Sequence, residues 1–197
     1  MTSNLKLSDL CYYADGRVAI SDLDLDTYIS TENMLPDKDG NTRSSGQPTV
    51  FQTQAYKADD VLVSNIRPYF RKIWFADRDG GCSNDVLVLR AKEICNPAFL
   101  YYLLSDNNFF DYATATSKGT KMPRGDKGAI MRYSVPDIPL DTQIKIADTL
   151  FALDARIAVN RKINHHLASP RSATDNSPDI RRGKIVSRVS AMLRLSA

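Results

Sequence analysis

The chain has 197 residues and a net charge of +3, a length that fits one domain plus an appendage. Hydrophobic residues make up 43% of it, enough for a sizeable core, but no run of 18 apolar residues occurs, which argues against a membrane span. The first ten residues, MTSNLKLSDL, lack the apolar segment of a signal peptide, so we expect a cytoplasmic protein.

Charge and residue usage are uneven along the chain. Residues 1–60 carry 5 basic and 10 acidic side chains, whereas residues 61–140 carry 11 basic and 8 acidic ones, which suits a partner that meets only one face. Only two of the 23 acidic residues are Glu; because Asp favours turns and caps, the body should be rich in loops and strands. The cysteines are odd in number and widely spaced, as expected of buried free thiols in a reducing cytosol: Cys11, Cys82 and Cys95.

The first 96 residues predict mainly strands and turns. Residues 5–13 fit a short strand or the first turn of a helix, and residues 15–47 fit turns and short strands. Apolar runs predict strands at 61–63, 73–76 and 85–90. The DRDGG sequence between the last two strands predicts a tight turn that joins them in a hairpin or meander.

A helix is expected next, over residues 97–113. Pro97 suits its first turn, and its aromatic side chains are most simply explained as part of the core and its rim. Residues 1–140 are therefore expected to form one strand-rich α+β domain with small helices.

The segment SKGTKMPRGDKGAIMR, residues 117–132, is the strongest candidate for a binding site. Its five basic residues face a single acidic one, and its three glycines and one proline predict a loop. Flexible cations and glycine amides suit phosphate oxygens. A second basic and aromatic cluster, RPYFRK at 67–72, favours a polyanionic partner, whereas a solvated loop without a ligand is the alternative for the first segment taken alone.

Residues 141–167 predict one long helix, because no Pro or Gly interrupts them and Asp141 can cap the start. The 4-3-4 spacing of a coiled-coil seam is found at Ile146, Leu150, Leu153 and Ile157, and the same register continues to Asn160, Asn164 and Leu167. Asn in a seam is costly but fixes register and partner. The alternative is a helix that packs on its own domain.

The last part of the chain has a different composition. Residues 168–197 contain six basic and two acidic side chains, much Ser and Arg, and scattered hydrophobic residues. This composition predicts a basic tail that is disordered or weakly ordered.

Sequence motifs of enzymes are missing. The chain contains no GxxxxGK[S/T], no GxSxG, no HExxH and no Asp/Glu-x-Lys triplet of the kind found in metal-dependent nucleases. His165 and His166 are adjacent, so they point in different directions on a helix and lack a third ligand nearby. We therefore expect neither a catalytic site nor a metal site.

In order along the chain, five segments resemble the specificity subunit of type I restriction-modification systems: VLVSNIRPYFRKIWFA, GGCSNDVLVLR, FLYYLLSDNNFFDYA, SKGTKMPRGDK and VPDIPLDTQIKIADTLFALDARIAVNRKINHHL. The resemblance covers about residues 5–167 and stops after Leu167, which implies that the tail, residues 168–197, comes from a rearrangement, truncation or frameshift. Its most specific part is the Pro-rich loop, Gln143 and the helix that runs Leu-Asp-x-Arg-Ile into Asn-Arg-Lys-Ile-Asn. The Gly-Thr-Lys-Met-Pro-Arg loop is nearly as specific.

This resemblance implies a target-recognition domain, residues 1–140, and a spacer helix, residues 141–167, in a non-catalytic subunit that reads double-stranded DNA. It also implies methylation and restriction subunits as partners, with S-adenosylmethionine, ATP and Mg on those partners and no cofactor in this chain. Family members usually hold two recognition domains and two helices paired antiparallel. Because this chain has one of each, we expect a homodimer that rebuilds the tandem arrangement.

Two lines of residues are the expected DNA contacts. The basic segment supplies Lys118, Thr120, Lys121, Arg124 and Lys127. The second line consists of Ser64, Asn65, Arg67, Tyr69, Arg71 and Lys72, in which Ser64 and Asn65 are expected to hydrogen-bond to bases. Two other functions stay open, namely a protein–protein adaptor that uses the helix and has lost DNA reading, and a stand-alone nuclease or methyltransferase.

Overall fold

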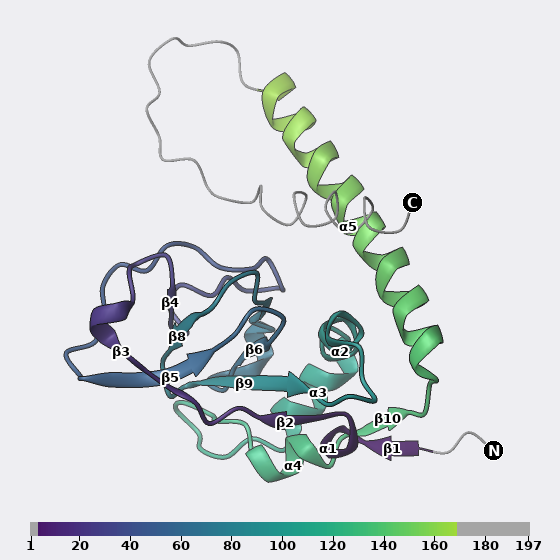
Figure 1. Ribbon diagram of the computed structural model, residues 1–197, viewed down its shortest axis with the longest axis horizontal. Helices are drawn as coiled ribbons and strands as arrows, with labels where there is room; N and C mark the ends of the chain where they lie inside the picture. Colours follow the sequence, from purple (N-terminus) through teal and green to yellow (C-terminus); the bar gives the residue numbers. More distant parts are fainter. Residues whose placement is uncertain (1–3, 169–197) are drawn as a thin grey trace. The chain divides into compact units, whose positions relative to one another are not determined.

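The computed structural model describes residues 4–168, without the side chains of Asn4, Lys162 and residues 165–168. The prediction for the tail, residues 168–197, therefore lies outside the described residues except for the backbone of Ala168. The chain separates into two compact units, Met1–Ile144 and Lys145–Ala197. The first unit is an α+β domain rich in short strands, and a long helix begins near its end (Figure 1). No helix in the described part of the chain is long and apolar enough to cross a membrane.

The first sheet of the domain is antiparallel and has the order β2-β9-β6-β7. Its strands are β2 (Cys11–Tyr13), β9 (Val86–Ala91), β6 (Val61–Ser64) and β7 (Ile73–Phe75). All four residues of β6 and the first four of β9 are buried, as expected for central strands covered on both faces. In the central register Val61 lies opposite Leu89 and Val63 opposite Leu87.

The predicted hairpin between the strands at 73–76 and 85–90 is wrong. β7 and β9 lie on opposite sides of β6 and do not pair with each other. The reason is that Gly80 and Gly81, expected to end a tight turn over 77–81, belong with Cys82 to strand β8 (Gly80–Cys82) of a second sheet. This second sheet has the order β3-β5-β8-β4, in which only the β4–β8 pair is parallel.

The second sheet uses the turn-rich segment of the sequence. Its other strands are β3 (Arg17–Ala19), β4 (Tyr28–Ile29) and β5 (Gln52–Tyr56), with a 3-10 helix, η1 (Ile20–Asp22), after β3. The expectation of turns and short strands over 15–47 is thus confirmed. One core joins the two sheets, because Ile29, Tyr56 and Cys82 are buried in the same cluster as Leu62 and Val88.

The N-terminal segment contains both of the alternatives that its sequence allows. Residues 4–13 form β1 (Asn4–Lys6), helix α1 (Leu7–Leu10) and β2 in succession. β1 pairs antiparallel with β10 (Ser134–Pro136), and the Leu7 amide donates to the carbonyl of Tyr133 at 2.8 Å. The start of the domain is therefore tied to the segment that precedes the long helix.

The expected helix over 97–113 is two helices, α2 (Pro97–Leu104) and α3 (Asn107–Ala115). Pro97 does occupy the first turn, and Asn96 caps α2 by accepting a hydrogen bond from the Phe99 amide at 2.9 Å. Asp106 ends the run because its carboxylate accepts from the Asn108 amide and starts a new helix. α2 packs on β6, β7 and β9, and α3 contacts the 3-10 helix η2 (Pro68–Phe70).

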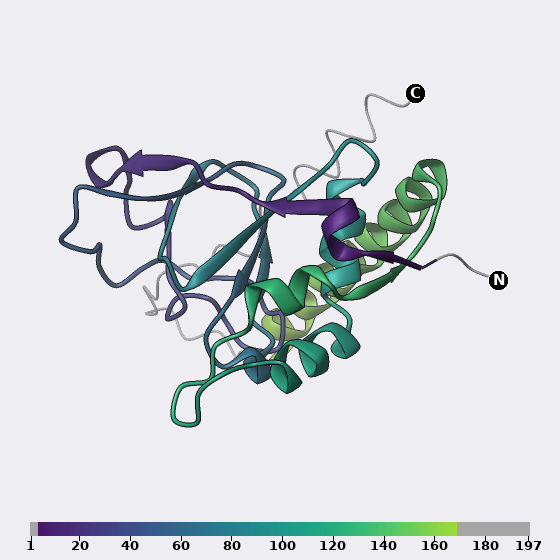
Figure 2. The same cartoon turned by 90° about the horizontal axis from the view of Figure 1, so that it is seen from below.

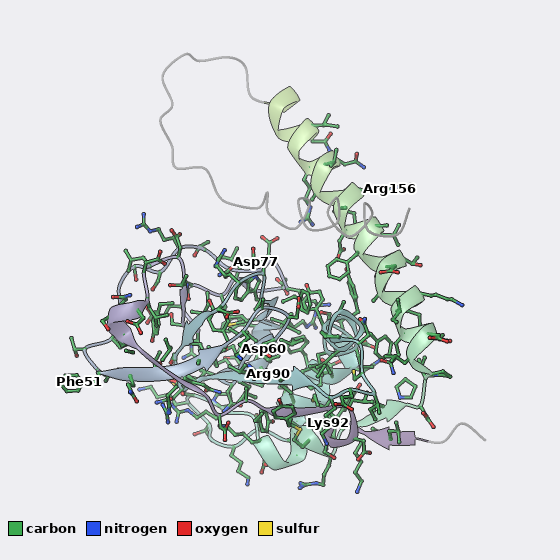
Figure 3. All side chains as sticks on the ribbon, viewed as in Figure 1. Phe51, Asp60, Asp77, Arg90, Lys92 and Arg156 are labelled. Carbon is green, nitrogen blue, oxygen red and sulfur yellow. The ribbon has the colours of Figure 1, made fainter. Side chains whose placement is uncertain are left out.

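A bidentate ion pair lies at one end of the two central strands of the first sheet, where Asp60 and Arg90 are close together (Figure 3). The Asp60 carboxylate accepts two hydrogen bonds from the Arg90 guanidinium, both at 2.7 Å, and a third from the Lys57 amide at 2.7 Å. These bonds to Asp60 raise the pKa of Arg90 above the ordinary value of an arginine side chain. Because the Asp60 side chain is almost completely buried, the pair fixes the turn before β6 onto β9.

The long helix α5 spans Leu140–Ala168, so Asp141 lies in its first turn and is not the cap that we expected. Gln143 is buried at its start and bonds to three backbone groups. It accepts from the Asn96 amide at 2.9 Å and donates to the carbonyls of Ile94 at 3.2 Å and Ile138 at 2.8 Å. One side chain therefore fastens the first turn of α5 to the domain.

The close packing of the second sheet gives a prediction for Gly80. A Cβ on this residue would collide with the Thr27 carbonyl oxygen, which is backbone, and with the Tyr56 hydroxyl that donates to it. We expect Gly80→Ala to lower the free energy of unfolding by roughly 1–3 kcal/mol, the usual cost of overpacking. Urea denaturation measures this, with Gly46→Ala as the control because no atom lies within 4 Å of its new Cβ. Equal midpoints for the two variants would contradict the packing of β8.

Candidate nucleic-acid interface

Three segments that are distant in sequence meet at the end of β6. The Asn65 amide donates to the carbonyl of Asp85 at 2.8 Å, and the Asn65 carbonyl accepts from the Gly125 amide at 3.0 Å. Buried backbone groups need such partners, because unpaired ones are costly away from water. The backbone of Asn65 thus joins the turn before β9 to the strongly basic segment of the chain.

Only the first part of that segment is a loop. Residues 127–131 form helix α4 (Lys127–Met131), so the loop predicted over 117–132 ends at Asp126. We call residues 117–126 the basic loop; it projects from the body of the domain between α3 and α4 (Figure 2). Lys118 and Arg124 close it by exchanging two backbone hydrogen bonds, at 2.8 and 2.9 Å, and Gly119 turns the chain with a φ of +96°.

Two acidic residues hold the ends of this loop through their side chains. Lys118 Nζ lies 2.6 Å from Asp126 Oδ2, and Arg124 Nη2 lies 3.1 Å from Asp85 Oδ1. Asp126 also caps α4, because it accepts from the Ala129 amide at 2.9 Å. The hydrogen bond from Lys118, followed by that from the Ala129 backbone, lowers the pKa of Asp126 to about 2.

The second cluster, residues 67–72, is an aromatic turn next to the basic loop. The Arg67 amide donates to the Pro123 carbonyl at 2.8 Å, which fixes the turn and the loop side by side. Arg67 and Arg71 both have left-handed backbone, with φ of 49° and 53°, a conformation that costs a non-glycine residue about 1 kcal/mol. Between them Tyr69 and Phe70 are exposed by 48% and 40%, with ring centroids 4.8 Å apart.

The predicted contact residues differ in how they are placed. Those on the surface are Tyr69, Lys118, Thr120, Lys121, Arg124 and Lys127, and those that are partly buried are Arg67, Arg71 and Lys72. Lys72 Nζ donates to the Thr31 carbonyl at 2.6 Å, and burial lowers its pKa. Lys127 Nζ lies 5.8 Å from the ring centroid of Tyr13. The structure therefore brings most of these side chains to one surface region, with Lys72 held in packing contacts.

Ser64 and Asn65, which we expected to hydrogen-bond to bases, are both buried in this structure. The Ser64 hydroxyl donates to the Ile66 carbonyl at 3.1 Å. Asn65 Oδ1 has no hydrogen-bond partner and faces Gly125, where an added Cβ would lie 2.8 Å away. Both residues shape the junction below the basic loop. Sequence reasoning missed the ion-pair roles of Asp85 and Asp126. Because 38 residues lie between Asp85 and Arg124, no local sequence signal indicated that pair.

The helix α5 presents apolar side chains on two sides. On the predicted seam Ile146 and Leu150 are partly buried, Leu153 and Ile157 are exposed by 48% and 49%, and Asn160 and Asn164 are exposed. The side chain of Leu167 lies outside the described residues. Val159 and Ile163, exposed by 44% and 50%, lie about 200° and 240° around the helix from Ile157 at 100° per residue.

Among the side chains that the structure describes, which do not include those of His165 and His166, no group of three or more His, Cys, Asp or Glu could hold a metal ion. The three cysteines are free and buried, as predicted, and burial raises the pKa of each thiol to about 12. Such thiols are poor nucleophiles and poor metal ligands at neutral pH.

The Asp126 carboxyl gives a prediction about pH. Its pKa in the folded protein is below the ordinary value of 3.8, so its contribution to stability is complete above pH 4 and is lost as the pH falls toward about 2. We expect Lys118→Met to raise the pKa of Asp126 toward 3.8, measured by NMR titration of the side-chain carboxyl. Lys121→Met is the control and should leave this pKa unchanged. An unaltered titration in Lys118→Met would contradict the ion pair.

Comparison with known proteins identifies the family. Residues 3–169 match the family described as the type I restriction modification DNA specificity domain. The chain is 25% identical over 158 residues to the EcoDI specificity subunit of Escherichia coli and 32% identical over 122 residues to the HindI specificity subunit of Haemophilus influenzae. These matches cover 76% and 58% of this chain but only 35% and 26% of the relatives, so the chain spans about a third of their length or less.

Solved structures agree at the level of the fold. The HsdS subunit from Thermoanaerobacter tengcongensis superposes with a TM-score of 0.61 and 19% identity, over 89% of this chain and 51% of that one. A chain from a study of complex assembly in the type I R-M system gives a TM-score of 0.63 and 22% identity over the same shares. The family match covers most of the sequence, and the strand-rich domain with its long helix recurs in these structures. The chain therefore belongs to the type I restriction modification DNA specificity domain family.

Proposed function

We propose that this chain reads DNA sequence as a specificity subunit of a type I restriction-modification system, without a catalytic site of its own. One observation carries the proposal. The basic loop is joined to the aromatic turn by the hydrogen bond from the Arg67 amide to the Pro123 carbonyl, in a chain of the DNA specificity domain family. Partner subunits would supply S-adenosylmethionine, ATP and Mg and would carry out methylation and cleavage.

The basic loop is suited to the DNA backbone and to base edges. Lys118, Lys121 and Lys127 are flexible point charges that suit phosphate oxygens, and the hydroxyl of Thr120 adds a donor. Arg124 carries a planar guanidinium, which can donate to two acceptors of guanine at once. Because backbone hydrogen bonds hold the loop on both sides, these groups would approach DNA in a fixed arrangement, and this lowers the entropy lost on binding.

The aromatic turn supplies a second line of contact. Arg67 and Arg71 flank the exposed Tyr69 and Phe70, so cations and rings alternate along the same short segment. The left-handed backbone of the two arginines is unfavourable for residues other than glycine, and a simple surface turn could be formed without it. Such strain is typical of functional sites, and it supports assignment of this turn to DNA contact.

The helix α5 would pair with a second copy through its seam. Leu153 and Ile157 supply apolar contact area, while Asn160 and Asn164 would fix the register of the two helices. A two-fold dimer rebuilds the arrangement of two recognition domains and favours a symmetric, interrupted DNA target. The other apolar side, with Val159 and Ile163, is then left for a methylation subunit.

The DNA-reading role is tested by removing the Arg124 guanidinium. We expect Arg124→Ala to weaken binding to duplexes selected from a random-sequence pool, measured as a dissociation constant at several salt concentrations. A phosphate contact would reduce the slope of log K against log salt by about 0.9, whereas a base contact would relax one base position at a cost of roughly 1–3 kcal/mol. Arg17→Ala, an exposed arginine on β3, is the control. Unchanged binding in Arg124→Ala would remove this residue from the interface.

The pairing role is tested by the mass of the chain in solution. We expect a dimer by light scattering, and we expect Ile157→Asp to give a monomer because a charge would enter the seam. Val159→Asp is the matched control, since it changes a residue of similar exposure on the other side of the helix and should leave the dimer intact. A monomeric wild type would mean that α5 needs another chain, and DNA binding lost with helix association kept would favour the protein–protein adaptor.

A further inference from the structure

We propose that Asp85 and Asp126 are specificity-determining residues. They hold cations of the basic loop in ion pairs and so weaken the binding that does not depend on DNA sequence. The inference rests on the proposed function, because it assumes that the loop meets DNA. It concerns two residues that are not themselves expected to grip phosphate. Each acid affects phosphate binding through the cation that it holds, and in this respect both are positioning residues.

The acids are the fixed members of the two pairs. Asp126 is held by the Ala129 amide at the start of α4. The backbone of Asp85 is held on both sides, since its amide donates to Ser83 Oγ at 3.3 Å and its carbonyl accepts from the Asn65 amide at 2.8 Å. The cations are more exposed than the acids, at 80% against 24% for Lys118 and Asp126 and 57% against 35% for Arg124 and Asp85. The cationic groups are therefore the members of each pair that can leave their partner and turn toward DNA.

These pairs change how the loop interacts with phosphate. The basic loop contains three cations, Lys118, Lys121 and Arg124, and together with Asp85 and Asp126 this group has a net charge of only +1. Binding of DNA regardless of sequence is driven by cations that replace the counterions of the phosphates. A cation that already has a carboxylate partner must give it up first. The loop therefore binds a duplex of random sequence less tightly than its number of lysines and arginines would suggest.

Contacts with bases can compensate for the broken ion pair, whereas contacts with phosphates cannot. Once Arg124 turns to DNA, the Asp85 carboxylate is left near a negatively charged surface, which is unfavourable. The amino groups of cytosine and adenine are the donors in the major groove that can pair with a carboxylate. Such a site favours a matching sequence and penalises other sequences.

The test uses the full chain, a pool of random-sequence duplexes and the variants Asp85→Asn and Asp126→Asn. Asn has nearly the same shape, and at position 126 it remains a good helix cap. We expect each variant to bind the pool about 3 to 10 times more tightly at low salt. The slope of log K against log salt should become steeper by up to about 0.9, and the sequences recovered from the bound fraction should be less restricted.

Two controls separate this role from a general change of charge. Glu93→Gln removes one negative charge on the turn after β9 and should not steepen the salt dependence. In the background of Arg124→Ala, Asp85→Asn should no longer tighten binding, because the acid acts through that arginine. An equal effect of Asp85→Asn with and without Arg124 would overturn the proposal. Thermal denaturation checks that each variant folds, and Asp126→Asn tests the second pair independently of the first.

The outcomes distinguish this inference from the function on which it rests. If the wild type recovers a preferred sequence and neither Asn variant tightens pool binding, the specificity role of the acids is wrong and the DNA-reading function stands. If neither the wild type nor the variants bind any duplex at low salt, both proposals fail.

Discussion

The structure depends on how the chain provides hydrogen-bond partners for the backbone groups at the end of a buried strand. β6 is covered on both faces, and the first residue after it, Asn65, is buried as well. Its amide and carbonyl cannot reach water and take their partners from Asp85 and Gly125. This requirement brings the basic loop to the end of a central strand, although 59 residues lie between Asn65 and Gly125. The position of the surface loop is therefore a consequence of the core.

The same junction explains why the loop and the aromatic turn act as one surface. The Arg67 amide bonds to Pro123 two residues before Gly125, so loop and turn are held at neighbouring points. On its far side the turn is held by the amides of Asp37 and Lys38, which donate to Phe70 and Arg71 at 2.9 and 3.0 Å. Support from both sides offsets the cost of left-handed backbone at the two arginines. Exposed rings can then be kept outside the core without loosening the domain.

Local patterns predicted the elements, and non-local contacts decided how they combine. The apolar runs at 61–63 and 85–90 are strands as expected, since hydrophobic periodicity is a local property. Their pairing was mispredicted because Gly80–Cys82 joins the second sheet, which no local pattern indicates. The break at Asp106 could have been found, since Ser-Asp-Asn inside an apolar run is a helix-start signal. At the candidate site the exposed cations were predictable from composition, whereas the burial of Ser64 and the Asp85–Arg124 pair depend on tertiary structure.

The pairing of β1 with β10 has a consequence for how such a domain can be arranged in longer chains. Asn4 lies opposite Pro136, so the chain enters and leaves the domain at neighbouring points. A unit whose two ends adjoin can be inserted between flanking segments, removed or exchanged without changing the distance that those segments must span. Whole-domain replacement would then alter the recognition surface at one step. Because Gln143 bonds to backbone groups of Ile94 and Asn96, a replacement domain with the same backbone course there would keep its attachment to α5. The geometry of two short strands thus makes the domain a transferable module.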